Sequence, residues 1–169
     1  MKKLLILLLL PITIFSQENH FDTTIARLIN EKINEYRVNK GRYNLIQTDR
    51  FKSETEQYCV KTAEIINATR RFEHSSIFGN GKYSEVCCFV PFNHSELSAD
   101  SLAYEVVDAY MNSRSHNVAI LDVGITKIHT SVYIYYDPKH EDWALYTATQ
   151  IMDWEYEIDI QYDRDNLEY

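Results

Sequence analysis

The feature that most constrains the fold is the run ITKIHTSVYIYYD over residues 125–137, which is rich in β-branched and aromatic residues. Its side chains alternate between two faces, with Ile128, Thr130, Val132 and Ile134 on one and His129, Ser131, Tyr133 and Tyr135 on the other. Such alternation is typical of a strand in a sheet. The short polar turn DPKHED leads into a second run over residues 143–154, and strands joined by so short a turn are antiparallel. We therefore expect a β-hairpin near the end of the chain, with residues 156–162 as a candidate third strand.

Three segments ahead of the hairpin show the spacing of apolar residues that predicts a helix. They cover residues 22–39, 49–67 and 99–112. Asp22 or Thr23, Asp49 and Ser98 are the candidate N-caps, and Gly41 is expected to end the first helix. The apolar run SEVCCFV over residues 84–90 is either a buried strand or a helix fragment, ended by Pro91. Helices first and a hairpin last predict an α+β layered domain.

The first residues have the layout of an export signal. Lys2 and Lys3 precede an apolar stretch, and Ser16 offers a small residue for cleavage. We expect residues 1–16 to be a signal peptide and the protein to be secreted or periplasmic. No second apolar stretch of that length follows, so we expect no transmembrane anchor in the mature chain. The domain is expected over residues 17–154, and residues 155–169 are expected to be an acidic tail or an extra strand.

The charge of the chain argues against one class of partner. The formal net charge is −8 at pH 7, and no basic patch stands out along the sequence. Because nucleic-acid binding depends on clustered lysine and arginine, we expect no nucleic-acid partner.

Several short motifs follow one another in a distinctive order. They are Asn34, Arg37 and Gly41 in INEYRVNKG; His74 in RFEHSS; the stretch Ser84, Glu85, Val86 and Cys87; Tyr110, Ser113, His116, Ile120 and Leu121 in YMNSRSHNVAIL; Gly124; and Thr149 with Gln150 in YTATQ. This series resembles the bacterial secreted branch of the CAP superfamily, the SCP-like domain of cysteine-rich secretory, antigen 5 and pathogenesis-related-1 proteins. The resemblance covers roughly residues 25–152. It implies an α-β-α sandwich, with an antiparallel sheet packed between helices.

The resemblance also implies a cleft lined by His74, Glu85 and His116. Imidazole nitrogen and carboxylate oxygen suit a divalent metal, with Zn²⁺ the most plausible ion. Many family members carry a further glutamate on the helix before the second histidine, and Glu105 and Asp108 are the candidates here. The expected function is a secreted binding or interaction module whose partner is a small ligand, a lipid or an extracellular protein. The alternative is a metal-assisted hydrolase with Glu85 as base, which the lack of a clear second glutamate makes the weaker expectation.

Simpler roles for these histidines remain open. His116 follows the third predicted helix, where a histidine often complements the helix dipole and caps carbonyls. His74 would then be an ordinary loop residue. We expect the remaining histidines to lie on the surface: His20, His94, His129 and His140.

The three cysteines allow at most one intramolecular disulfide, which an exported protein would be free to form. Cys59 is expected to face the core from the second helix. If Glu85 faces the cleft that the family implies, Cys88 faces the core in an extended segment and Cys87 does not. We therefore expect the bridge to join Cys59 and Cys88.

Overall fold

The computed structural model describes residues 19–50, 52–69, 71, 83–92, 97–137 and 142–153. The segments predicted to be a signal peptide and a C-terminal tail, and also His74, lie outside these residues. The elements are β1 (His20–Phe21), α1 (Thr23–Asn39), β2 (Ile46–Gln47), α2 (Lys52–Thr69), β3 (Tyr83–Phe92), α3 (Ala99–Asn112), α4 (Arg114–Ile120), β4 (Ile125–Asp137) and β5 (Asp142–Asp153). No helix in this part of the chain has the length and apolar character needed to cross a membrane.

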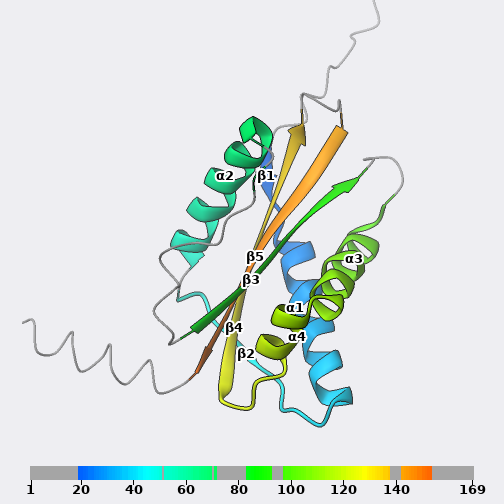
Figure 1. Cartoon of the computed structure of the whole chain (residues 1–169), viewed down its shortest axis with the longest axis vertical. Helices are drawn as coiled ribbons and strands as arrows, with labels where there is room; N and C mark the ends of the chain where they lie inside the picture. Colours follow the sequence, from blue (N-terminus) through cyan, green and yellow to red (C-terminus); the bar gives the residue numbers. More distant parts are fainter. Residues whose placement is uncertain are drawn as a thin grey trace, which may run out of the picture.

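The sheet is built on three long antiparallel strands, β3, β5 and β4 (Figure 1). Its order is β1-β4-β5-β3, and the short β2 runs parallel to β4. The expected hairpin is confirmed, because β4 and β5 pair from Ile125 with Asp153 to Asp137 with Asp142. The α+β class expected from the sequence is therefore the class of the structure.

Helices cover both faces of this sheet, α2 on one side and α1, α3 and α4 on the other (Figure 1). Because side chains alternate along β4, one set packs into the core on the α1 and α3 side and the other into the core on the α2 side. Ile128, Val132 and Ile134 pack in the cluster that α1 and α3 cover. Tyr133 and Tyr135 pack in a smaller cluster beneath α2. The predicted α-β-α sandwich thus follows from a strand that is apolar on both faces.

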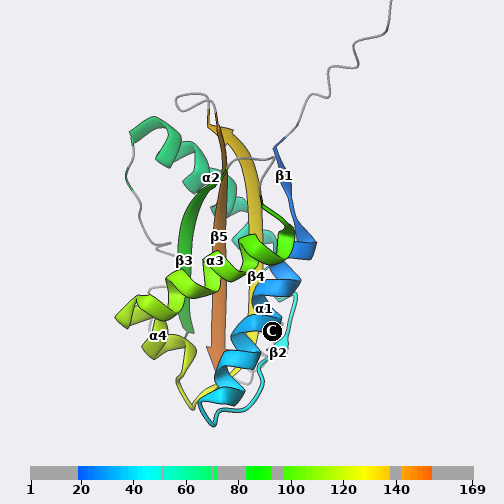
Figure 2. The same ribbon diagram turned by 90° about the vertical axis from the view of Figure 1, so that its right-hand side faces the viewer.

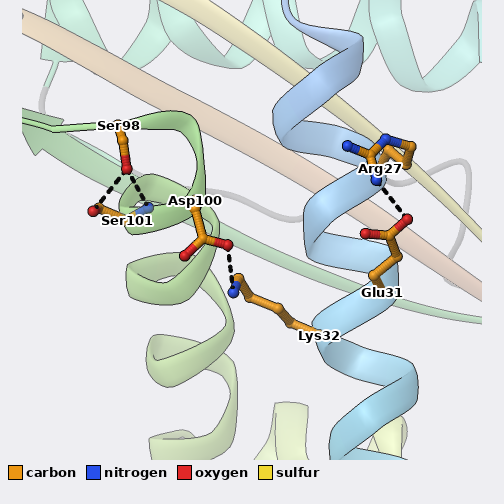
Figure 3. A network of polar contacts seen from close by, with 6 residues as sticks. All are labelled: Arg27, Glu31, Lys32, Ser98, Asp100 and Ser101. Carbon is orange, nitrogen blue, oxygen red and sulfur yellow. Dashed lines mark hydrogen bonds and ion pairs between the residues drawn. The ribbon is translucent and has the colours of Figure 1, made fainter.

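The ends of the helices follow the capping residues in the sequence. The side chain of Asp22 accepts a hydrogen bond from the Ile25 amide, and that of Ser98 accepts one from the Ser101 amide. Gly41 has φ +72° just beyond α1, a conformation that glycine adopts without steric cost. Lys32 of α1 also forms a 2.8 Å ion pair with Asp100 in the first turn of α3 (Figure 3).

One expectation about the elements is wrong. Pro91 does not end β3, which continues to Phe92; β3 is the last strand in the sheet order, where a residue without an N–H is tolerated. Residues 114–120 form a further short helix, α4, ahead of β4. On α3, Ala103 and Val107 are buried and Ala109 is exposed.

Candidate functional site

One buried side chain, Tyr110 of α3, connects the elements that carry two of the predicted site residues. Its ring meets the ring of His116 edge to face, with centroids 5.5 Å apart and an interplanar angle of 82°. Its hydroxyl donates a 3.3 Å hydrogen bond to the main-chain carbonyl of Val86, the residue after Glu85. Tyr110 is completely buried, so both contacts are made by a side chain with little freedom to move.

His116 lies in the first turn of α4 and does not cap α3. The C-cap of α3 is Ser113, whose amide bonds the carbonyl of Ala109 at 3.2 Å. The positive end of the α4 dipole is near His116, so the helix-cap interpretation, which needs a helix C-terminus, is wrong.

Polar contacts fix α4 against α1 and α3. Asn117 accepts a hydrogen bond from the Tyr36 hydroxyl at 3.1 Å and donates one to the carbonyl of Met111 at 3.0 Å. The buried Arg37 guanidinium donates to the carbonyl of Ile120, the last residue of α4. His116 therefore sits on a short helix that is held at its middle residue and at its C-terminal end.

Arg37 makes two further bonds in the same region, to the carbonyl of Tyr43 at 2.9 Å and to that of Asp122 at 3.1 Å. Burial is the main cause that lowers the pKa of Arg37, the neighbouring charge of Arg42 lowers it further, and Asp122 acts in the opposite direction. Asn34 similarly exchanges two hydrogen bonds with the main chain of Leu45. These residues of the first motif therefore shape the scaffold and do not line the predicted cleft.

Glu85 is half-buried in β3 and belongs to the opposite face from Val86. Its carboxylate accepts a hydrogen bond from the thiol of Cys87 at 3.7 Å, and Cys87 packs beneath α2. His116 contacts Tyr110, which belongs to the core on the other side of the sheet. The two predicted site residues thus lie on opposite faces and can meet only around the outer edge of β3, beside which the described part of the chain has no strand.

The predicted metal set is not assembled by the described residues alone. Within them, no group of three or more histidine, cysteine, aspartate or glutamate side chains is arranged to hold a metal ion. Glu105 is exposed, and Asp108 accepts a 2.9 Å hydrogen bond from Asn112 on its own helix. A protein zinc site needs at least three ligands, so metal binding at Glu85 and His116 depends on His74, and it stays a prediction.

The cysteines are divided between the two cores. Cys59 and Cys87 are buried in the cluster beneath α2, whereas Cys88 packs against the cluster on the other face. The expected preference of Cys59 for Cys88 is therefore wrong, because Cys59 and Cys88 are on opposite sides of the sheet. All three are thiols in this structure.

His129 is a polar group that the sequence interpretation placed on the surface, and it is only 5% exposed. Its Nδ1 lies 2.7 Å from the carbonyl oxygen of Thr48, and its Nε2 lies 3.2 Å from the hydroxyl of Ser131. Burial lowers the pKa of His129 below its usual value, against smaller opposing effects of Thr48, Asp49 and Glu56. The alternation along β4 could have indicated this burial, because it places His129 on the same face as the large rings of Tyr133 and Tyr135.

No protein-family model matches the chain, and no curated protein is detectably similar to it in sequence. The structure is similar to that of an outer surface protein from Borrelia burgdorferi, with a TM-score of 0.52 and 17% sequence identity. The match covers 80% of this chain and 99% of that chain. At this identity the likeness concerns the fold alone.

Proposed function

We propose that this protein is a secreted binding module of the CAP type, with a ligand site at the outer edge of β3 between Glu85 and His116. The observation that carries the proposal is the double contact of Tyr110. One end of this side chain meets the His116 ring, and the other meets the β3 main chain next to Glu85. The buried Tyr110 side chain thus links the position of the His116 ring to the position of the β3 main chain next to Glu85.

The outer edge of β3 is a suitable place for a ligand for two reasons. Both residues are half-buried, although the Oε2 atom of Glu85 is itself buried. His74 lies in the chain between α2 and β3, a short distance ahead of Glu85 in sequence. A third ligand from that segment would give the two nitrogens and one carboxylate that divalent metal sites use.

The chemistry of the site favours a divalent cation or a small polar ligand. A neutral imidazole offers one nitrogen lone pair, and a carboxylate offers oxygen atoms that bind cations or accept hydrogen bonds. Binding of either ligand would involve no chemical reaction, as expected of a binding module. The export-like first residues and the likeness to a protein named for an outer surface support an extracellular location.

A calorimetric titration of the mature protein with Zn²⁺ tests the proposal. We expect one site per chain in the wild type and a loss of at least tenfold in affinity in His116→Ala. His20→Ala is the matched control, because His20 is an exposed histidine on β1, at the opposite end of the sheet order. Equal affinities of wild type and His116→Ala would refute the site.

A further inference from the structure

The β4 edge that faces away from β5 is covered at its two ends but not in the middle (Figure 2). β1 pairs with β4 at Tyr133 and Ile134, and β2 pairs with it at Lys127 and Ile128. Among the described residues, no strand covers the stretch between these pairs. A cavity of about 80 Å³ lies at this gap, lined by the start of α1, by α2 and the chain before it, and by residues 129–132.

His129 and Ser131 both line the cavity. They are two apart on one strand, so their side chains stand next to each other on the same face. The Nδ1 of His129 is 2.7 Å from the carbonyl oxygen of Thr48. A carbonyl only accepts hydrogen bonds, so Nδ1 must carry the hydrogen. The other nitrogen, Nε2, is then the acceptor, and the hydroxyl of Ser131 at 3.2 Å donates to it.

This arrangement has the parts of an activated nucleophile. A serine hydroxyl is bonded to the basic nitrogen of a histidine, and a third group fixes the histidine in the required tautomer. The carboxylate of Asp49 lies 3.8 Å from Nδ1, where it would stabilise the imidazolium formed when the serine loses its proton. The other charged side chains that face the cavity are Asp22, Lys52 and Glu56.

The environment keeps His129 in the form that a base requires. Burial lowers the pKa of the imidazole, so it is neutral at pH 7. A neutral imidazole next to a hydroxyl accepts a proton as the hydroxyl attacks.

We propose that Ser131 is a nucleophile and His129 its general base, in a second site that hydrolyses esters of short acyl groups. The oxygen of Ser131 bonds to the carbonyl carbon of the ester, and its proton passes to Nε2 of His129. The ester bond then breaks, and the leaving alcohol takes that proton. Water attacks the acyl-serine in the same way, which releases the acid and restores both side chains.

The size of the cavity sets the substrate class. The cavity volume of about 80 Å³ suits a small acyl group such as acetyl. This site contains neither Glu85 nor His116. A negative result at one of the two proposed sites therefore does not bear on the other.

Acetylation by p-nitrophenyl acetate tests the proposal, with the modified residue located by peptide mass spectrometry. We expect the acetyl group on Ser131 and its loss in Ser131→Ala, which removes one oxygen. In His129→Gln the rate of Ser131 acetylation should fall at least about a hundredfold, the usual contribution of a general base. His20→Ala, which changes an exposed histidine, should leave that rate unaltered.

Folded wild-type protein that neither carries acetyl on Ser131 nor releases p-nitrophenol faster than Ser131→Ala would overturn the proposal, and so would an equal rate in folded His129→Gln. Near-ultraviolet circular dichroism establishes whether the variant is folded. If it is not, acetylation of Ser131 in the wild type, compared with that of the exposed Ser115, decides the question.

Discussion

The guanidinium of Arg37 on α1 donates a hydrogen bond to the main-chain carbonyl of Ile120 at the end of α4, although the two residues are 83 apart in sequence. The same group also reaches the carbonyls of Tyr43 and Asp122. One buried cation therefore satisfies the main chain at three places and fixes the helix that carries His116.

Replacement of Arg37 by methionine should destabilise the protein by about 3 kcal/mol, because buried carbonyls would lose their donors. Arg42→Met is the matched control. Arg42 is exposed and donates to the carbonyl of Leu121, so its loss should cost less than about 1 kcal/mol. Urea unfolding measures both values, and equal losses would contradict the role assigned to Arg37.

Tyr110→Phe should lower the free energy of unfolding by about 1 kcal/mol, since it removes the hydrogen bond to Val86 and keeps the ring. Tyr110→Leu also removes the ring contact with His116 and should weaken Zn²⁺ binding more than Tyr110→Phe does. Thermal unfolding and calorimetric titration of the two variants provide the comparison. A Zn²⁺ affinity unchanged by the loss of the ring would show that Tyr110 does not position His116.

Oxidation of the thiols should join Cys59 to Cys87, because both are buried in the core beneath α2. Non-reducing peptide mapping of Cys87→Ser and Cys88→Ser separates the two partners. The bridge should persist in Cys88→Ser and disappear in Cys87→Ser, and it should stabilise the protein by about 3 kcal/mol. A bridge that survives in Cys87→Ser would show that Cys88 reaches across the sheet.

The buried His129 should make the protein less stable in mild acid. Its pKa is lowered in the folded state, so below about pH 6.5 the unfolded chain binds more protons than the folded one. Its contribution is complete above that pH and is lost as the pH falls toward the folded-state pKa. The difference in unfolding free energy between wild type and His129→Gln should therefore shrink from about pH 7.5 to about pH 5, and a constant or growing difference would contradict this.

Much of the fold could be predicted because local signals and packing agree. The alternation over residues 125–137 gives the bounds of β4, and the helical spacing over residues 99–112 gives those of α3. Asp22 and Ser98 are capping residues whose side chains bond the amides as predicted. β1 and β2 were missed because each has two residues and is defined by its pairing with β4, which no local pattern reveals.

The candidate sites were harder to predict, since they depend on which faces the helices cover. The sequence shows that Glu85 and Val86 point to opposite sides of a strand, but not which side His116 reaches. No motif includes His129, so the sequence predicts it at the surface, although α2 covers its face of the sheet and buries it. The bond between His129 and Thr48 joins residues 81 apart, beyond the reach of any periodicity.

We propose that Glu85 and His116 act as one site around the edge of β3, although their contacts lie on opposite faces of the sheet. A double-mutant cycle on Zn²⁺ affinity, with His116→Ala, Glu85→Gln and the double variant, measures their coupling directly. We expect the double variant to bind Zn²⁺ no more weakly than the weaker-binding single variant, so that the two losses of affinity do not add. Additive losses of Zn²⁺ binding free energy would contradict a shared site. Unchanged Zn²⁺ affinity in both single variants would contradict it too.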